Sequence, residues 1–460
     1  MNLKQYDTVY FLGIGGIGMS ALARWFKYLG MTIAGYDSTS SKLTNELIAE
    51  GMDIHFGCDL EKISNYLTMN TLVIYTPAVP VDNAEYNFFL ENKIPMHKRS
   101  EILGLISKNF ITVAIAGTHG KTTTSSMIAH ILKSADMSLV AFLGGIANNY
   151  NSNLIFQGNM DSKTFLVAEA DEFDRSFLRL FPKIAVVTSA DADHLDIYGN
   201  HQNLLTSFKD FVGQIDKSGF LVIHKSVEKL TSASRGFVCK SYSLDEGDFY
   251  VGNLVLGHRS LKFDVLGFQK TINIELNVAG IHNVENALAA LIVCNQLGVK
   301  VDVIQSALSS YTGVKRRFEY IIERDDLVYI DDYAHHPAEI LSFLKSLKTI
   351  YPSQKITVVF QPHLYSRTRD FASEFAQSLS LADEILLLEI YPARELPMEG
   401  VSSEIIFNGI TCKTKILCHK NDLLNQLNKL EIKVLATLGA GDIDSLVSPI
   451  KENLMQRNEI

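Results

Sequence analysis

Two stretches of this 460-residue chain carry residue types and spacings that could bind phosphate groups. The stronger is "AIAGTHGKTTTSSMIAHIL", in which Gly117 and Gly120 permit a tight loop between an apolar run and an amphipathic helix. Backbone N–H groups at the start of such a helix can bind phosphate oxygens, while Lys121 supplies a positive charge and Thr122 a hydroxyl for Mg²⁺. The loop departs from the full Walker pattern, because Ile115 stands where the first glycine would be. We interpret it as a phosphate-binding loop rather than as an ordinary strand–turn–helix junction.

The second stretch is "FLGIGGIGMSAL" near the N-terminus, where Gly13, Gly15 and Gly18 have the G-x-G-x-x-G spacing. Asp37 closes the next apolar segment, nineteen residues after Gly18, as the ribose-binding acid of a dinucleotide site would. The pattern alone is weak evidence for NAD, and the chain has a separate and better phosphate site. We therefore expect the loop to hold the pyrophosphate of a nucleotide-linked substrate, with an NAD-dependent dehydrogenase as an alternative.

Acidic residues and one histidine follow two further apolar runs. They are Glu169, Asp171, Glu172 and Asp174 in "FLVAEADEFD", and Asp191, Asp193, His194 and Asp196 in "VVTSADADHLD". In open parallel sheets ligands gather beyond the carboxyl ends of the strands, where carboxylates and an imidazole beside a triphosphate would suit Mg²⁺. Any single carboxylate here could instead cap a helix.

Polar residues also follow four apolar runs in the last third of the chain. They are Asp331, Asp332, His335 and His336, then His363, Arg367 and Arg369, then Arg394 and Glu395 in "YPARE", and finally Asp442, which follows Gly439 and Gly441. Taken singly, a His or Arg is more often merely solvated. Together, the four strand ends predict one wall of a binding site.

The elements that must position these residues form three consecutive α/β units. Short apolar runs alternate with helical patterns along most of the chain, which predicts parallel sheets with crossover helices. We place the units at residues 1–107, 108–314 and 315–460. Between residues 242 and 277 the pattern changes to alternating strands, which predicts a small β-elaboration of the second unit.

Composition excludes several classes of protein. The net charge of −9 argues against nucleic acid as a partner, and no apolar run approaches the roughly 18 residues of a membrane span. The five cysteines are scattered without a C-x-x-C pair, which indicates reduced thiols and no zinc site. We expect a cytoplasmic protein of ordinary globular composition.

The order of these motifs resembles the Mur ligase family, and within it the branch that adds L-alanine to UDP-N-acetylmuramate. The resemblance covers nearly the whole chain and is carried by "GIGGIGMSALA", "YTPAVP", "AGTHGKTTT", "EADEFDRSF", "DADHLDIYG", "GIHNVENALAA", "KRRFEY", "DDYAHHPAEI", "QPHLYSRTRD" and "YPARE". It implies a Rossmann-like UDP-substrate domain, a central P-loop ATPase, and a Rossmann-like C-terminal domain that closes over ATP and the amino-acid site.

The resemblance also implies roles for individual residues. The UDP-substrate would contact Gly13, Gly15, Gly16, Gly18, Met19, Asp37, Thr76, Pro77 and Ala78. ATP would contact Gly117, Thr118, His119, Gly120, Lys121, Thr122, Thr123, Asn283, Asn286, Arg317 and Asp332. Mg²⁺ would be held at two sites by Thr122, Glu169 and His194, with Mn²⁺ as a possible substitute. His335, His336, Arg367 and Arg369 would form the acyl and amino-acid site, and the catalytic set would be Lys121, His194, Arg317, His335 and His336.

The implied reaction joins L-alanine to the lactoyl carboxylate of UDP-N-acetylmuramate through an acyl phosphate formed from ATP, in the synthesis of peptidoglycan precursors. The partners are therefore small molecules, and the chain would be a monomer or a homodimer. Two alternatives remain beside the dehydrogenase: a ligase that adds a ready-made tripeptide to the same sugar, and a nucleotide-binding regulator without turnover. Lys209, fifteen residues after His194, is either a carbamylated metal bridge, as in sister ligases, or a solvated helix lysine.

Overall fold

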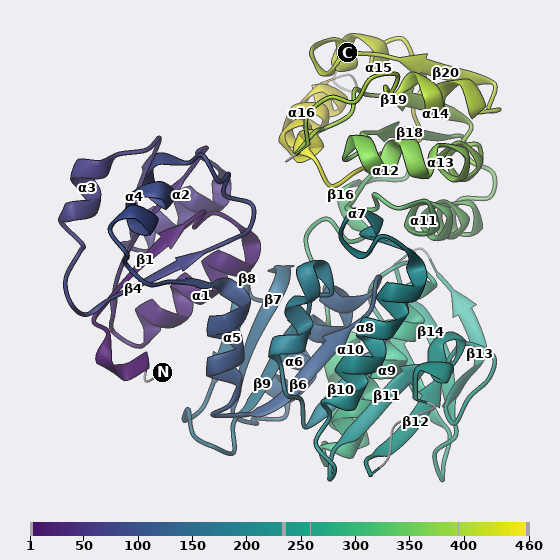
Figure 1. Ribbon diagram of the computed structural model, residues 1–460. Helices are drawn as coiled ribbons and strands as arrows, with labels where there is room; N and C mark the ends of the chain where they lie inside the picture. Colours follow the sequence, from purple (N-terminus) through teal and green to yellow (C-terminus); the bar gives the residue numbers. More distant parts are fainter. Residues whose placement is uncertain (1–2, 232–235, 258, 394, 457–460) are drawn as a thin grey trace. The chain divides into compact units, whose positions relative to one another are not determined.

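The computed structural model describes residues 3–231, 236–257, 259–393 and 395–456, so Arg394 of "YPARE" lies outside the described residues (Figure 1). Its contacts divide the chain into two compact units. Unit 1 comprises Met1–Gly252, Val265–Ile272 and Asn286–Leu308, and unit 2 comprises Asn253–Asp264, Asn273–Glu285 and Ser309–Ile460. The boundaries that we place at 107/108 and 314/315 stay a prediction.

The first sheet of unit 1 is parallel and has the strand order β3-β2-β1-β4-β5. Its strands are β1 (Thr8–Leu12), β2 (Thr32–Asp37), β3 (Asp53–Phe56), β4 (Thr71–Tyr75) and β5 (Met96–Lys98). The accompanying helices are α1 (Ile17–Tyr28), α2 (Lys42–Ala49), α3 (Leu60–Ser64), α4 (Ala84–Glu91) and α5 (Arg99–Ser107). The strand order reverses at β1 and β4, which is where ligands bind in doubly wound sheets. The glycine loop follows β1 at this switch point.

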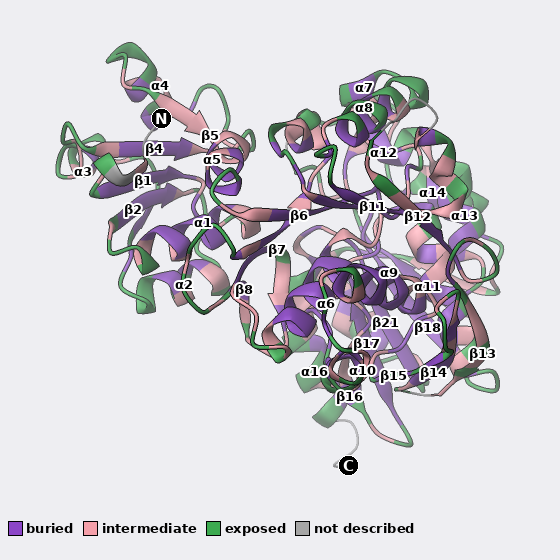
Figure 2. Cartoon of the chain, turned by 90° about the horizontal axis from the view of Figure 1, so that it is seen from below, coloured by how far each residue is buried: buried purple, intermediate pink, exposed green. Residues whose placement is uncertain are grey.

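The second sheet of unit 1 has the order β12-β11-β10-β6-β9-β7-β8, with only the edge strand β8 antiparallel to its neighbour. Its strands are β6 (Ile111–Ala116), β7 (Leu139–Ala147), β8 (Ser152–Gln157), β9 (Phe165–Ala170), β10 (Ile184–Val187), β11 (Phe220–His224) and β12 (Val238–Tyr242). The central strands are largely apolar because helices cover both faces of a parallel sheet, and Figure 2 shows β6 and β11 largely buried.

The helices and short turns between these strands carry most of the predicted ATP site. They are α6 (Lys121–Ser134), α7 (Leu195–Tyr198), α8 (His201–Gly213), α9 (His282–Gln296) and α10 (Val301–Ser310), with 3₁₀ turns η2 (Phe173–Arg179) and η3 (Lys225–Thr231). The predicted β-elaboration is present as a three-stranded sheet of β13 (Tyr250–Leu256), β14 (Leu261–Leu266) and β15 (Ile272–Leu276).

Unit 2 contains a six-stranded sheet of order β16-β17-β21-β18-β19-β20, in which only β16 pairs in the antiparallel sense. Its strands are β16 (Glu319–Glu323), β17 (Val328–Asp332), β18 (Ile356–Phe360), β19 (Glu384–Leu387), β20 (Thr414–Leu417) and β21 (Val434–Leu438). The helices are α11 (Pro337–Ile350), α12 (Tyr365–Asp370), α13 (Ala372–Leu379), α14 (Glu404–Gly409), α15 (Leu423–Leu427) and α16 (Val447–Gln456). In the part of the chain that the structure covers, no helix has the length and apolar character needed to cross a bilayer.

Within unit 1, Asn153 of β8 joins the two sheets by binding helix α1. Its amide nitrogen donates to Ile17 O at 2.6 Å and to Ser20 Oγ at 2.8 Å, and its oxygen accepts from Arg24 at 2.5 Å. The side chain is fully buried, so removing its amide would take a hydrogen-bond partner from each of these groups without giving them water in exchange. Asn153 therefore fixes the helix that begins at the glycine loop.

We expect Asn153→Ala to lower the free energy of unfolding by about 2–4 kcal/mol, because it leaves buried polar groups unsatisfied. Urea denaturation followed by circular dichroism measures this loss. Asn109→Ala is the control, since Asn109 is exposed and its amide makes only two long contacts of 3.4 Å. A loss no larger than that of the control would show that the amide does not hold the two sheets together.

Candidate active site

The loop between β6 and α6 has the backbone geometry of a phosphate cradle. Gly117 has φ +138° and Gly120 has φ +81°, values that side-chain-bearing residues rarely adopt. A Cβ atom on Gly117 would lie 2.0 Å from Thr188 Oγ1, so the loop also needs glycine for lack of space. Helix α6 begins directly at Lys121, which points its first N–H groups at the loop.

Residues after β10 brace this loop from the neighbouring strand. Ser189 Oγ accepts the backbone N–H of His119 at 2.9 Å and bonds the Thr118 hydroxyl at 2.9 Å. Thr118 Oγ1 also accepts the N–H of Asp191 at 3.1 Å, and the His119 ring lies 3.4 Å from the Asp191 carboxylate. The side chains of Thr118 and His119 therefore shape the loop, and the following Thr123 is buried inside α6.

Lys121 is held by a carboxylate that the sequence analysis placed in an acidic cluster without giving it a partner. Its Nζ donates to both oxygens of Glu172 at 2.9 Å and to Gly117 O at 2.6 Å. Burial acts to lower the pKa of Lys121, but Glu172, Asp171 and Glu169 outweigh it and the pKa is raised. The amine therefore stays charged at every physiological pH.

Thr122 and Glu169 are brought together, as the magnesium interpretation requires. Thr122 Oγ1 donates to Glu169 at 3.1 Å, and Ser125 Oγ lies 3.4 Å from the same carboxylate. The backbone N–H of Gly144 also donates to Glu169, at 2.5 Å. Hydroxyl and carboxylate oxygens are the ligands that Mg²⁺ prefers, so the pair fits the ion together with its waters. Among the described residues, no three His, Cys, Asp or Glu side chains converge as a complete metal cage.

His194 lies on the other side of Glu172. Its Nε2 is 3.9 Å from Glu172 Oε1 and 3.8 Å from Asp193 Oδ2, and its ring meets that of Phe173 edge-on. Its φ of +51° places it in the left-handed region immediately before α7. Lys209 is exposed on α8, as expected for a solvated helix lysine.

The two asparagines of "HNVEN" lie three residues apart at the start of α9. Asn286 Oδ1 accepts from Thr124 Oγ1 at 3.1 Å and would lie 2.6 Å from a Cβ on Gly120, so it borders the phosphate loop. Asn283 belongs to unit 2 and donates to Ala279 O at 2.6 Å.

Asp37 contacts the backbone of the glycine loop after β1. Its carboxylate accepts the N–H of Gly15 at 2.7 Å and that of Thr39 at 3.4 Å, so it holds the loop itself. Gly16 caps α1, and Thr76, at the end of β4, lies so close to Gly13 that a Cβ there would be 2.7 Å from its methyl group. The 76–78 turn closes through an N–H of Ala78 to Thr76 Oγ1 at 3.5 Å, across Pro77.

Met19 differs from the other residues of the predicted UDP site. Its side chain is 1% exposed and belongs to the hydrophobic core beneath the first sheet. The side chain therefore packs against the core, and the contact of Met19 with the UDP-substrate stays a prediction.

Sequence reasoning missed two basic residues that contact the acidic loop after β9, one of which also lies over the glycine loop. Arg99 lies over Gly18, where a Cβ would be 2.7 Å from its guanidinium, and 3.5 Å from the Asp171 carboxylate. Lys98 Nζ lies 3.2 Å from Asp174. The signal was available in "HKRSEIL", because basic residues where a helix begins oppose its dipole and need acidic partners.

In unit 2 the end of β17 places Asp332 against the "KRRFEY" segment. Its carboxylate accepts the N–H of Phe318 at 2.6 Å and that of Ala334 at 2.7 Å. The Arg317 guanidinium lies 5.0 Å from the centre of the Tyr333 ring. Burial raises the pKa of Asp332 to about 6, although Arg317 and the two N–H donors act in the opposite direction.

This pKa predicts a pH dependence whose sign can be worked out. The folded pKa exceeds the unfolded value of about 3.9, so the folded state binds the proton more tightly and this group stabilises the fold as pH falls from 7 to 5. We expect the melting temperature of the wild type, relative to Asp332→Asn, to rise by about 2 °C or more over that range. Melting curves at pH 7, 6 and 5 measure the difference, and a difference independent of pH would contradict the assignment.

The two predicted histidines differ in their hydrogen bonds. His335 Nδ1 donates to Tyr333 O at 2.9 Å and lies 3.3 Å from Glu339. His336 caps α11, where its Nδ1 accepts the N–H of Ala338 at 3.4 Å. In the neutral rings the proton therefore resides on Nδ1 of His335 and on Nε2 of His336.

The two predicted arginines of α12 are also distinguished. Arg367 is 5% exposed, whereas Arg369 is exposed and donates to the adjacent Asp370 at 2.7 Å. The Arg367 side chain is therefore fixed by packing within unit 2, whereas that of Arg369 extends into solvent.

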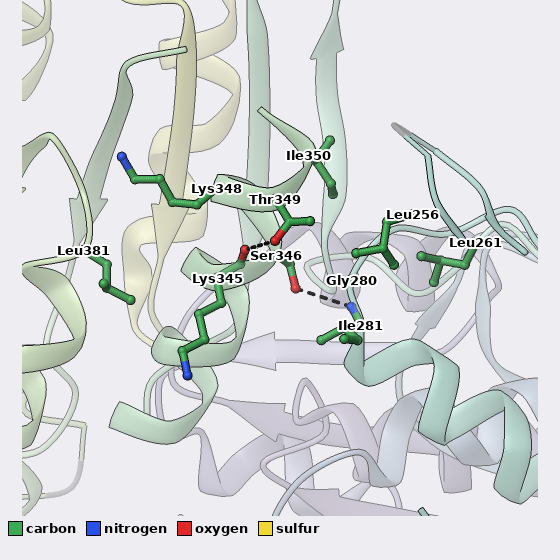
Figure 3. Close-up of a pocket in the computed structure, with 10 residues that line it drawn as sticks. All are labelled: Leu256, Leu261, Gly280, Ile281, Lys345, Ser346, Lys348, Thr349, Ile350 and Leu381. Atoms are coloured by element: carbon green, nitrogen blue, oxygen red, sulfur yellow. Dashed lines mark hydrogen bonds between the residues drawn. The ribbon is translucent and has the colours of Figure 1, made fainter. Parts of the chain in front are cut away.

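Unit 2 contains a pocket of 440 Å³ (Figure 3). It is lined by Leu256, Leu261, Gly280, Ile281, Lys345, Ser346, Lys348, Thr349, Ile350 and Leu381. Within it the Ile281 N–H donates to Ser346 Oγ at 3.3 Å, while the two lysine amines point away from Gly280 and Ile281. The predicted site residues do not contribute to its lining.

Comparison with known proteins gives matches along the whole chain. Family models match as "Mur ligase family, catalytic domain" at residues 8–111, "Mur ligase middle domain" at 115–294 and "Mur ligase, glutamate ligase domain" at 316–442. The chain is 47% identical over 460 residues to a UDP-N-acetylmuramate–L-alanine ligase of Cytophaga hutchinsonii, covering 99% of each chain. It is 48% identical over 463 residues to a protein of that name from Flavobacterium psychrophilum, covering 99% of this chain and 100% of the relative.

Solved structures agree with this similarity. The UDP-N-acetylmuramate-alanine ligase of Thermotoga maritima has a TM-score of 0.80 at 28% identity, covering 98% of this chain and 99% of that one. A murein peptide ligase of Psychrobacter arcticus has a TM-score of 0.74 at 23% identity, covering 97% of this chain and 98% of that one. The second likeness shows the fold alone.

Proposed function

Because the chain belongs to the Mur ligase family, we propose that it is an ATP-dependent ligase that joins L-alanine to the lactoyl carboxylate of UDP-N-acetylmuramate. The observation that carries the proposal is the meeting of Lys121, Thr122 and Glu169 at one phosphate loop, in a chain that matches alanine-adding relatives over 99% of its length. The reaction is a step of peptidoglycan precursor synthesis, and we place it in the cytoplasm.

The first half of the reaction needs positioning more than acid–base chemistry. The substrate carboxylate attacks the γ-phosphorus of ATP, the bond to ADP breaks, and an acyl phosphate forms. Since a carboxylate is nucleophilic as it stands, the chain's contribution is to align the two anions and to offset their charge, with Lys121 as the nearest cation. Mg²⁺, held by Thr122 and Glu169 and at a second site by His194, supplies further charge neutralisation when bound. Asn283, Asn286, Arg317 and Asp332 are proposed to hold the nucleoside.

The second half needs a proton acceptor, because the amino group of alanine must be neutral to attack the acyl carbon. The amine adds, phosphate leaves, and one proton must depart from nitrogen. We assign this proton to His335, whose Nδ1–H is directed to Tyr333 O, so that Nε2 is the basic nitrogen of the neutral ring. His336 uses its Nδ1 lone pair to cap α11 and is proposed to orient the site, with Arg367 on the acceptor carboxylate.

The UDP half of the substrate is proposed to lie at the glycine loop. The N–H groups of Gly13, Gly15 and Gly16 and the start of α1 would face the pyrophosphate, with Gly18, Thr76, Pro77 and Ala78 around it. Asp37 supports this loop from behind through Gly15, which leaves it a structural role in place of the ribose contact that an NAD enzyme would need.

The test is phosphate release and product mass with ATP, Mg²⁺ and UDP-N-acetylmuramate, with and without L-alanine. Release that depends on alanine, with one alanine added to the sugar nucleotide, is the expected result. Turnover with the tripeptide alone would assign the chain to the recycling ligases, and nucleotide binding without turnover on any acceptor would make it a regulator. Size-exclusion chromatography with light scattering separates the monomer from the homodimer.

A further inference from the structure

Glu172 is a buried carboxylate that the mechanism above does not use. Its side chain is fully inaccessible to solvent, and both of its oxygens lie 2.9 Å from Lys121 Nζ. The Tyr198 hydroxyl donates to the Glu172 carbonyl at 2.6 Å, which fixes the backbone from which the carboxylate projects. The side chain alone is therefore able to change partner.

The hydrogen bonds of Lys121 are complete without a nucleotide. A lysine ammonium has three N–H donors. The three acceptors around it are Gly117 O at 2.6 Å and the two oxygens of Glu172. No donor remains for a phosphate oxygen in this arrangement, so a nucleotide must displace at least one of these acceptors.

We propose that Glu172 is an internal counter-ion that competes with nucleotide phosphate for Lys121. This inference rests on the ATP-dependent function proposed above. The carboxylate keeps the lysine charged and aimed along the loop before ATP arrives, and the phosphate then takes its place. Where no metal is bound to His194, its Nε2, 3.9 Å from Glu172 Oε1, lies within reach of the displaced carboxylate. The same competition helps ADP to leave, because Glu172 returns to Lys121 as the product departs.

The test compares ADP binding by calorimetry to the wild-type chain and to Glu172→Gln, with Mg²⁺ and in EDTA. The amide keeps the shape and one acceptor but removes the charge, so ADP should bind about tenfold more tightly under both conditions. The turnover number should fall several-fold as ADP release slows. Affinity and turnover thus change in opposite senses, which general damage to the fold would not produce.

Asp174→Asn is the matched control, because Asp174 lies in the same loop but bonds Lys98 at 3.2 Å. It removes one carboxylate charge without touching Lys121, and its ADP affinity should stay within about twofold of the wild type. If Glu172→Gln does not fold, Glu172→Asp keeps the charge and shortens its reach, and should tighten ADP binding by a smaller factor.

Three results would overturn the inference. If Glu172→Gln binds ADP more weakly with Mg²⁺ but not in EDTA, Glu172 is a metal ligand. If it binds ADP more weakly under both conditions, Glu172 is a support that orients Lys121 toward the phosphate. If its ADP binding is unchanged, Glu172 does not compete with phosphate for Lys121. The proposed function is tested by a different result. If the variant binds ADP more tightly but the wild type does not ligate alanine, the role of Glu172 as a counter-ion is supported and the proposed ligase activity is refuted.

Discussion

Lys121→Ala should abolish alanine-dependent phosphate release, with a fall of at least about 10³-fold, while UDP-N-acetylmuramate still binds. In the described part of the phosphate loop, Lys121 is the one Lys or Arg side chain. Its Nζ lies 2.9 Å from both carboxylate oxygens of Glu172. Without it the γ-phosphate would face the carboxylates of Glu172 and Glu169 without the positive charge that Lys121 places beside them. Repulsion should then raise both the barrier and the Kd for ATP.

Lys133→Ala is the control for this prediction. Lys133 lies in the last turn of the same helix α6, where its amine packs over the Tyr150 ring at 4.7 Å. It should ligate alanine at a rate close to that of the wild type. Calorimetry with UDP-N-acetylmuramate completes the experiment: loss of that binding in a folded Lys121→Ala chain would contradict the division between the glycine loop and the phosphate loop.

The apolar runs and the rule that ligands gather at carboxyl ends predicted that the acidic residues after one strand would lie near the phosphate loop after another. The structure shows why this is so for Glu169: β6 and β9 are neighbours in register, with Ile115 opposite Glu169, so the loop after one strand meets the residue at the end of the other. The choice of Glu169 as the partner of Thr122 came from the resemblance to the Mur ligases. Geometry of this kind depends on the backbone alone.

Contacts between side chains could not be predicted in the same way. "EADEFD" offers four carboxylates, and only the turn η2 decides that Glu172 turns inward to Lys121 while Asp174 meets Lys98. Non-glycine residues with positive φ, such as Asp174 at +48°, set these directions, and sequence periodicity carries no sign of them.

Asp37 and the arginines of α12 illustrate the same limit. Asp37 has the spacing of a ribose ligand, yet its carboxylate is used by the N–H of Gly15, 22 residues earlier in the chain. Arg367 and Arg369 are two positions apart on one helix, so they face different directions, and burial selects Arg367. Packing against the rest of the unit decides which of the two arginines is buried.

Glu169→Gln should lower kcat/KM by about 10²–10³-fold and raise the Mg²⁺ concentration for half-maximal rate by about tenfold or more. The amide oxygen can still accept the Gly144 N–H, so the strand end keeps its shape. What disappears is the negative charge 3.1 Å from Thr122 Oγ1, where a divalent cation would sit. Binding of Mn²⁺ followed by electron paramagnetic resonance measures this site without turnover.

The matched control for the metal prediction is Glu228→Gln, because Glu228 is paired with Lys225 at 2.6 Å in a turn after β11. It should leave the Mg²⁺ requirement unchanged. If the Glu169→Gln variant is slow but binds Mn²⁺ as tightly as the wild type, Glu169 is not a metal ligand and instead orients the Thr122 hydroxyl. Weaker Mn²⁺ binding together with the lost rate would assign the charge of Glu169 to the metal, because the amide keeps the same shape and differs mainly in charge.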